Sequence, residues 1–350
     1  MNDIDTRYLF RMTDCTGIFQ HSVFGVPDPS EGYTTDDNAR ALILAAMLYE
    51  RSPEERYRAL LFRFLSFLLY AEHGRWVRNF MNYDRSFTEK RGSEDCYGRC
   101  VLALCFTASR AALPSAVRAC AEELLLRVLP GCSALTFPKP KAYALSGLGL
   151  FQRTETQPFR KSLRDSLVGT YFQNRSESWH WFEDDVTYCG GILPFAMLSG
   201  GAERERKIGL ESLDFLLREE FRGGVFYPVG CRGWLHRGGK PSIYDEQPVE
   251  ACSMLLACLK ARDETGNPAY AARARESFLW YLGRNLGEFV MIDPETGGCL
   301  DGITPDGPNR NEGAESILCW LISALLAEKE GWFPEKRPQA LGILAERDGR

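Results

Sequence analysis

Thr34-Thr35-Asp36-Asp37-Asn38-Ala39-Arg40 places two carboxylates at the start of an apolar helical run, directly after an aromatic residue. Four later stretches repeat the arrangement: Ser93-Glu94-Asp95-Cys96-Tyr97-Gly98-Arg99, Trp181-Phe182-Glu183-Asp184-Asp185, Tyr244-Asp245-Glu246-Gln247-Pro248 and Asn311-Glu312-Gly313-Ala314-Glu315. Self-similarity on this scale is the signature of a repeated supersecondary unit. If such units close into a ring, the helix starts and their acids gather at one end.

The hydrophobic periodicity predicts two alternating kinds of helix. One kind is apolar over most of its circumference, which indicates burial; these segments are about 36–49, 95–110, 141–152, 185–199, 248–262 and 313–328. The other kind has a charged face that meets solvent; these segments are about 54–72, 114–129, 158–173, 203–220, 267–285 and 338–347. The alternation predicts an all-α protein, an (α/α)6 toroid of six inner and six outer helices in a single domain over residues 1–350.

Long turns lead from each outer helix to the next inner one, and several contain short β-like pieces bounded by glycine. These pieces are Gly17-Ile18-Phe19-Gln20, Gly74-Arg75-Trp76-Val77, Gly223-Gly224-Val225-Phe226-Tyr227 and Gly297-Gly298-Cys299-Leu300. Loops of this length inside a compact domain are usually functional. We therefore expect a pocket at the end of the ring where these turns lie.

The composition excludes several classes of function. The formal net charge is -5 and the basic residues are scattered, which is not the pattern of a nucleic-acid-binding protein. No apolar stretch approaches the roughly 20 residues of a membrane span, and the acidic N-terminus does not resemble a secretion signal. The 12 cysteines include no Cys-x-x-Cys pair, and no metal or nucleotide motif is present. These features predict a cytoplasmic protein without a metal or another cofactor.

The acids at the helix starts have a structural explanation as well as a functional one. A carboxylate in the first turn of a helix gains about 0.3–1 kcal/mol from the helix dipole. Asp36 and Asp95 each stand four residues before an arginine, Arg40 and Arg99, which allows an ion pair on one helix face. Seven carboxylates gathered at one mouth would, however, raise one another's pKa, at a cost in free energy that capping does not offset. These are Asp37, Glu94, Asp184, Asp185, Asp245, Glu246 and Glu315. The set as a whole favours a functional site, although any single member could be a cap.

Glycoside chemistry needs two carboxyl groups that face each other across the scissile bond. The stretch Trp179-His180-Trp181-Phe182-Glu183-Asp184-Asp185 offers Asp184 or Asp185 as the acid. Asp37, Asp245 or Glu246 would be the opposing base. Trp179 and Trp181 could stack on sugar faces or could simply pack within the loop layer. The remaining candidates for binding a sugar are His21, Asp36, Arg40, Glu94, Asp95, His180, Tyr244 and Glu315.

The run from Phe10-Arg11-Met12-Thr13-Asp14 through Gly17-Ile18-Phe19-Gln20-His21 to Gly32-Tyr33-Thr34-Thr35-Asp36-Asp37-Asn38-Ala39-Arg40-Ala41-Leu42 carries a family resemblance. The chain resembles the six-hairpin glycosidase-like superfamily, and within it an uncharacterised bacterial family found with glycosyltransferases. The resemblance implies a toroid and a carbohydrate ligand. The superfamily includes inverting glycosidases, unsaturated glucuronyl hydrolases, and sugar epimerases or isomerases that use histidine pairs.

Three hypotheses follow. The leading one is an inverting hydrolase of a short oligosaccharide that pairs Asp184 or Asp185 with Asp37 or Glu246. The second is a sugar epimerase or isomerase in which His180 and His236 pass a proton at carbon. The third is a non-catalytic glycan-binding partner of a glycosyltransferase.

Overall fold

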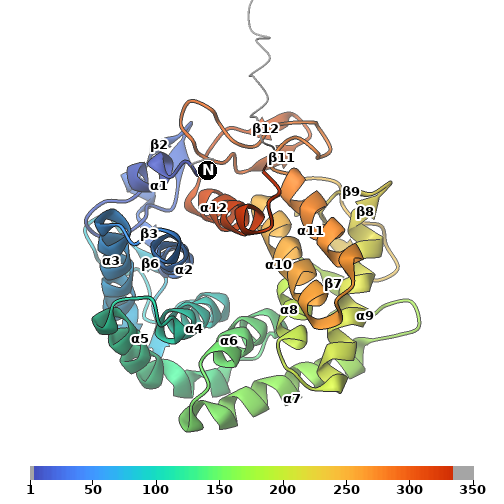
Figure 1. Cartoon of the computed structure of the whole chain (residues 1–350), viewed down its shortest axis with the longest axis horizontal. Coiled ribbons are helices and arrows are strands. Elements are labelled where there is room, and N and C mark those ends of the chain that lie inside the picture. Colours follow the sequence, from blue (N-terminus) through green and yellow to red (C-terminus); the bar gives the residue numbers. More distant parts are fainter. Residues whose placement is uncertain (1–3, 334–350) are drawn as a thin grey trace, which may run out of the picture.

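The computed structural model describes residues 4–333, and its helices alternate between an inner and an outer ring (Figure 1). The inner helices are α2 (Thr35–Arg51), α4 (Glu94–Ser109), α6 (Pro138–Leu150), α8 (Ile192–Leu198), α10 (Pro248–Thr265) and α12 (Ala314–Lys329). Each inner helix contacts the next one, and α12 contacts α2, so the ring closes. The predicted (α/α)6 toroid is confirmed.

The outer helices have one buried face and one solvent face. They are α3 (Glu55–Ala71), α5 (Ser115–Val128), α7 (Gln157–Asn174), α9 (Glu203–Glu220) and α11 (Pro268–Leu279). The short helix α1 (Arg7–Arg11) contacts α12. The predicted outer helix at 338–347 lies outside the described residues. Short 3-10 turns occupy Pro29–Glu31, Leu129–Ala134 and Thr154–Thr156.

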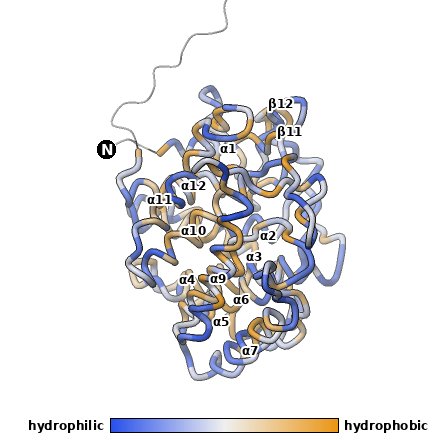
Figure 2. The backbone as a smooth tube through the Cα atoms, turned by 90° about the vertical axis from the view of Figure 1, so that its right-hand side faces the viewer, coloured by the Kyte–Doolittle hydropathy of each residue, from blue (hydrophilic) through white to orange (hydrophobic). Residues whose placement is uncertain are grey.

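The inner helices approach one another closely at small residues. A Cβ atom added to Gly98 of α4 would lie 2.6 Å from the carbonyl oxygen of Pro140 in α6. One added to Gly191, just before α8, would lie 2.3 Å from the carbonyl oxygen of Ser253 in α10. Hydrophobic residues concentrate on the inner helices such as α10 (Figure 2). The buried core therefore lies between the two rings and along the contacts of the inner one.

Six short antiparallel strand pairs lie in the turns. They are β1 (Ser22–Val23) with β2 (Val26–Pro27), β3 (Tyr33–Thr34) with β6 (Phe80–Met81), β4 (Glu72–His73) with β5 (Trp76–Val77), β7 (Asp185–Val186) with β10 (Leu235–His236), β8 (Phe221–Arg222) with β9 (Val225–Phe226), and β11 (Gly302–Thr304) with β12 (Gly307–Asn309). Short strands in the loops were predicted and are found: the pieces at 74–77 and 223–227 contain β5 and β9, whereas those at 17–20 and 297–300 contain isolated β-bridges. The pair β3–β6 joins the start of α2 to the turn before α4.

One predicted element is wrong. The sequence at 185–199 was expected to be helical throughout, but Asp185 and Val186 form β7 and α8 begins only at Ile192. Between them, Cys189 has a positive φ of 52°, and a glycine pair follows it. A helix cannot continue through a residue in that conformation, so the start of this unit is a loop.

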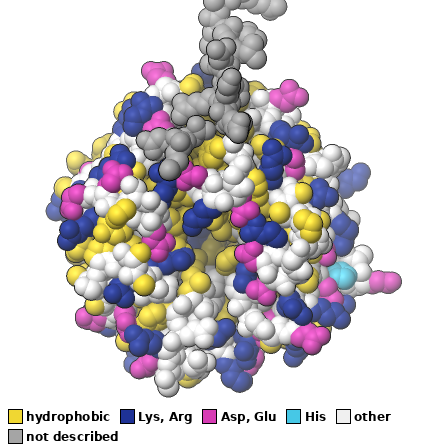
Figure 3. Space-filling model, viewed as in Figure 1, with side chains coloured by type: hydrophobic (Ala, Val, Ile, Leu, Met, Phe, Trp, Pro, Cys, Tyr) yellow, Lys and Arg dark blue, Asp and Glu magenta, His cyan; other side chains and the backbone are white. Residues whose placement is uncertain are grey.

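The surface viewed down the ring carries hydrophobic, basic and acidic side chains interspersed, with a hollow near the centre (Figure 3). Within residues 4–333, no helix combines the length and the apolar character needed to cross a membrane.

Candidate active site

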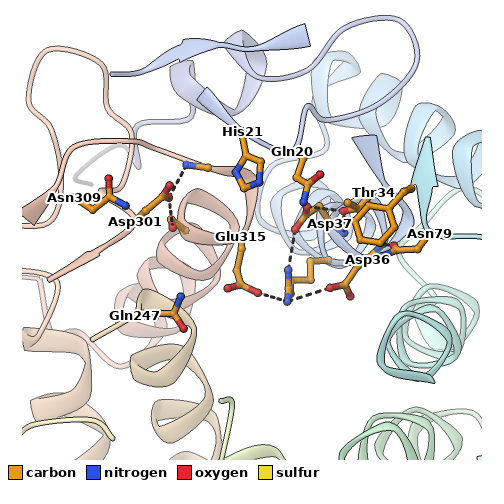
Figure 4. Close-up of a pocket in the computed structure, with 14 residues that line it drawn as sticks. Gln20, His21, Thr34, Asp36, Asp37, Asn79, Gln247, Asp301, Asn309 and Glu315 are labelled. Atoms are coloured by element: carbon orange, nitrogen blue, oxygen red, sulfur yellow. Dashed lines mark hydrogen bonds and ion pairs between the residues drawn. The ribbon is translucent and has the colours of Figure 1, made fainter. Parts of the chain in front are cut away.

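A cavity of about 370 Å³ lies where α2 and α12 begin. Its polar lining includes Gln20, His21, Thr34, Asp36, Asp37, Arg40, Asn79, Gln247, Asp301, Asn309, Glu315 and Ser316 (Figure 4). Phe80 also lines it. Five residues predicted from the sequence therefore meet here: His21, Asp36, Asp37, Arg40 and Glu315. Among residues 4–333, no three His, Cys, Asp or Glu side chains are grouped so as to hold a metal ion.

Arg40 is the centre of the charged network. Its Nη1 donates a hydrogen bond to Oδ1 of Asp37 over 2.8 Å, and its Nη2 lies 2.5 Å from Oε2 of Glu315 in α12. The same Nη2 lies 3.5 Å from Oδ2 of Asp36, one turn earlier in α2. One buried guanidinium thus faces three carboxylates, because the planar guanidinium presents donors in several directions.

Asp37 is also part of the start of α2. Thr34 is the residue that caps this helix: its hydroxyl oxygen accepts a hydrogen bond from the backbone N–H of Asp37 over 3.1 Å. The same hydroxyl donates to Oδ2 of Asp37 over 2.6 Å. Asp37 therefore does two things: it stabilises the start of α2, as expected for an acid in the first turn, and it lines the cavity.

The environment of Asp37 raises the pKa of its carboxyl group toward neutrality. Burial raises the pKa of Asp37 to about 6, although the charge of Arg40 opposes the shift. The negative charges of Asp36 and Glu315 raise this pKa further, while the hydrogen bond from Thr34 lowers it. A carboxyl group whose pKa lies near neutrality is suited to exchanging protons with a substrate.

A second arginine reaches Asp36 from the neighbouring inner helix. Nε of Arg99 lies 3.0 Å from Oδ1 of Asp36, but neither atom makes a hydrogen bond of good geometry. The contact is therefore an ion pair with a misaligned N–H. The sequence spacing allowed Arg99 to pair with Asp95, whereas Asp95 accepts a hydrogen bond of 2.6 Å from the hydroxyl of Tyr188. The i,i+4 pairing expected for Asp36 and Arg40 is present.

Asp301 is a cavity residue that the sequence patterns did not single out. It follows the β-like piece that ends at Leu300, and its Oδ1 accepts hydrogen bonds of 2.6 Å from the backbone N–H of Gly313 and from the hydroxyl of Ser316. Burial raises the pKa of Asp301, while these hydrogen bonds and the charge of His21 oppose the shift. No hydrogen bond to its Oδ2 is formed by the described residues. Figure 4 shows Asp301 on one side of the cavity, Asp36 and Asp37 on the other, and His21 between them.

The structure does not bring Asp184 and Asp185 to this cavity, which corrects the expected pairing with Asp37 or Glu246. Asp184 is exposed, and its Oδ1 lies 2.9 Å from Nε of Arg237. Oδ1 of Asp185 lies 2.5 Å from Nδ1 of His236 across the β7–β10 pair. Because this segment forms a loop and a short strand in place of a helix start, its acids stay among the surface loops.

Asp245 and Glu246 also lie away from the cavity wall, where their neighbour Gln247 takes the corresponding place. Oε2 of Glu246 accepts a hydrogen bond of 2.5 Å from the indole N–H of Trp280. Burial raises the pKa of Glu246 to about 7, although this hydrogen bond and the charge of Arg222 oppose the shift. Oδ2 of Asp245 lies 3.6 Å from Nε of Arg232.

Several other predicted binding residues stabilise the loops. Trp179 and Trp181 are buried and pack against Phe215, so their faces are not open to a sugar. Nε2 of His180 lies 3.0 Å from the carbonyl oxygen of Glu177. The carbonyl oxygen of Tyr244 accepts a hydrogen bond from the hydroxyl of Ser242 over 2.7 Å.

Glu94 fixes the entry to α6. Its carboxylate accepts hydrogen bonds from the backbone N–H groups of Thr136 and Phe137 over 2.7 and 3.0 Å, and from the Thr136 hydroxyl over 2.7 Å. Burial opposes ionisation of Glu94, but these hydrogen bonds together lower its pKa. The geometry assigns Glu94 to holding the loop in place.

No protein-family model and no curated protein sequence matches the chain. Solved structures do match it. A sugar epimerase from a ruminal bacterium has a TM-score of 0.70 and 10% identity, with 92% of this chain and 96% of that chain covered. The cellobiose 2-epimerase of Bacillus thermoamylovorans has a TM-score of 0.68 and 12% identity, covering 91% and 95%.

A glycoside hydrolase has the same architecture. The GH76A α-1,6-mannanase of Salegentibacter sp. has a TM-score of 0.61 and 12% identity, covering 93% of this chain and 96% of that chain. At these identities the similarity shows the fold. The chain therefore shares the expected (α/α)6 toroid with these proteins.

Proposed function

We propose that the chain is a carbohydrate-active enzyme that hydrolyses a glycosidic bond in a short oligosaccharide. The observation that carries the proposal is the pair Asp37, which is buried, and Asp301, which is partly buried. Both carboxyls have raised pKa values and lie on opposite sides of one cavity. Glycoside hydrolysis uses two such groups, one as an acid and the other as a base or nucleophile. The cavity of about 370 Å³ is near the lower end of the range for small-molecule sites, which suits one or two sugar rings.

Asp301 is the better candidate for the general acid. Its Oδ1 takes both hydrogen bonds from Gly313 and Ser316, which leaves Oδ2 to carry a proton toward a glycosidic oxygen. The choice rests on this free oxygen: burial raises the pKa of Asp301, and the hydrogen bonds from Ser316 and Gly313 and the charge of His21 oppose the shift. Asp301 replaces Asp184 and Asp185 in this role.

Asp37 is the candidate for the general base. With a pKa of about 6 it is ionised at neutral pH, yet it is basic enough to accept a proton from an attacking water. Arg40 fixes its orientation, and Glu315, Asp36 and Gln247 are placed to bind sugar hydroxyls. We favour inversion of the anomeric centre, which requires carboxyl oxygens about 6.5–9.5 Å apart to admit the water.

A second candidate function is epimerisation or isomerisation of a sugar. His21 lines the cavity between Asp301 and Asp37, and an imidazole is able to move a proton at carbon near neutral pH. The pair expected from the sequence, His180 and His236, does not support this function, because neither lines the cavity and His236 is engaged by Asp185. Two of the three similar structures reported above are named as epimerases.

The deciding experiment incubates the protein in heavy water with disaccharides and monosaccharides of glucose, mannose and galactose. New reducing ends that disappear in Asp37→Asn and Asp301→Asn would support hydrolysis. Deuterium at a sugar carbon, lost in His21→Asn, would support epimerisation. Asp184→Asn, at an exposed position, is the matched control. Binding of sugars without any turnover would contradict both enzymes and favour a glycan-binding partner of a glycosyltransferase.

A further inference from the structure

We infer that Phe80 is a stacking platform for a pyranose ring at the cavity wall, and so determines which sugars the site accepts. The inference rests on the proposed carbohydrate function. Phe80 belongs to β6, pairs with Thr34 of β3 and lines the cavity. It is an apolar side chain on a wall that is otherwise largely polar.

The backbone holds Phe80 in a fixed position. Its N–H donates a hydrogen bond of 2.9 Å to the carboxylate of Glu89, and its carbonyl oxygen accepts one of 2.9 Å from the N–H of Thr88. The preceding residue is also tied to α2, because Oδ1 of Asn79 accepts a hydrogen bond of 3.2 Å from the N–H of Asp36. Phe80 and the carboxylates at the start of α2 therefore form one rigid unit.

The ring of Phe80 differs from its aromatic neighbours because no other ring and no cation among the described residues covers it. The nearby Phe87 packs against Phe67 and is covered by Arg78, whose guanidinium carbon lies 4.0 Å from the ring centre. Tyr83 lies 6.1 Å from Phe19. Phe80 makes no ring–ring or cation contact with any residue of 4–333, and 48% of its surface is exposed. An exposed aromatic face at a polar cavity gains free energy when an apolar surface covers it.

A pyranose ring has the required complementary shape. One face presents C–H groups, which stack on the negative face of an aromatic ring, while the hydroxyls project at the edge. A sugar placed on Phe80 would direct those hydroxyls toward Asp36 and Asn79, which lie on the same unit. The platform fits sugars whose stacked face has only C–H groups, as in the equatorially substituted rings of cellobiose, and disfavours rings with an axial hydroxyl on that face.

The test measures binding of cellobiose, lactose and α-1,6-mannobiose to the whole chain by saturation-transfer NMR, followed by calorimetric titration of the disaccharide that binds best. Phe80→Ala should weaken that binding roughly 10- to 100-fold, as expected for lost apolar contact. Phe80→Trp should keep it within about threefold, and Phe80→Leu should lose most of it because a leucine has no flat face. Phe172→Ala is the matched control, since Phe172 on α7 is 46% exposed and lies outside the cavity lining.

The outcomes separate the two proposals. Unchanged affinity in Phe80→Ala, with clear binding by the natural chain, overturns the platform and leaves the proposed function standing. Failure of all three sugars to bind the natural chain counts against both. Equal losses in Phe80→Ala and Phe172→Ala would indicate a general effect on the fold and contradict the platform. Circular dichroism of each variant confirms that the helices are retained.

Discussion

Nη1 of Arg40 donates a 2.8 Å hydrogen bond to Oδ1 of Asp37 inside the cavity. Both residues are buried, so the pair is little screened by solvent or salt. Asp37 nevertheless keeps a pKa of about 6, because burial and two further carboxylates outweigh the favourable charge. The protonation state of the proposed base thus depends directly on its neighbouring guanidinium.

The first prediction is that kcat/KM rises as the pH increases through about 6, where Asp37 loses its proton. In Arg40→Gln the favourable charge is gone, so the pKa of Asp37 should increase and the acidic limb should move to higher pH by at least about one unit. Arg40→Lys retains the charge and should shift it less. A ¹³C NMR titration of the Asp37 carboxyl provides the same measurement without a substrate. An acidic limb that stays in place in Arg40→Gln would exclude Asp37 as its source.

The second prediction separates the acid from the base. A 2,4-dinitrophenyl glycoside has a leaving group that departs without protonation. Asp301→Asn should therefore lose about 10²–10⁴-fold in kcat on a disaccharide but little on the activated glycoside. Asp37→Asn should lose activity on both, because water still requires a base. Steady-state kinetics on both substrates measures the difference, with Asp184→Asn as the control. Equal losses on both substrates in the two variants would refute the assigned roles.

The ring of helices could be predicted because the pattern of apolar and polar residues within each helix shows whether that helix is buried or faces solvent. The inner helix α12 is apolar nearly all round, and the outer helix α9 was expected at 203–220, where it is found. The spacing of Asp36 and Arg40 likewise placed two cavity residues on one helical face. The prediction failed at α8, where the conformation of Cys189 and the glycine pair ended the helical pattern.

The remainder of the cavity depends on which loops meet in space. Contacts between loops that are distant in the sequence leave no local pattern from which they could be predicted. Asp301 and Phe80 come from turns that approach the cavity only after the ring has closed. The pattern of acids at helix starts also could not distinguish a cavity residue such as Asp37 from Glu246, which faces Trp280. A signal for Asp301 was present in the glycine-bounded piece that ends at Leu300, just before it.

The third prediction concerns the stability of the fold at alkaline pH. Glu246 has a folded pKa of about 7, above its ordinary value of roughly 4.3. Its protonated form is therefore favoured in the folded chain, and the stability it contributes is complete below about pH 4 and is lost as the pH rises through 7. Glu246→Gln keeps an acceptor for Trp280 and carries no charge. The variant should be more stable than the natural chain by about 1–3 kcal/mol at pH 8, with a smaller difference at pH 5.

Urea unfolding at the two pH values measures this effect. Glu295→Gln, an exposed carboxylate in a loop, is the control and should change stability little at either pH. A Glu246→Gln variant whose advantage is the same at pH 5 and pH 8 would mean that this carboxyl does not titrate as inferred.

The fourth prediction concerns the close contact between α4 and α6, which positions Arg99 over the ring of Tyr143 at 4.4 Å. A Cβ atom at Gly98 would lie 2.6 Å from a backbone oxygen of Pro140, and backbone atoms of packed helices cannot move away cheaply. Gly98→Ala should therefore destabilise the fold by about 1–3 kcal/mol, as overpacked positions do.

Gly169→Ala in α7 is the matched control, since no atom lies within 4 Å of the added Cβ. It should raise stability by up to about 1 kcal/mol, because alanine favours a helix more than glycine does. The urea midpoints of both variants measure the difference in sign. If Gly98→Ala were tolerated as well as Gly169→Ala, the inner helices would be farther apart than described. The placement of Arg99 beside Asp36, and with it the charge balance at the start of α2, would then have to be revised.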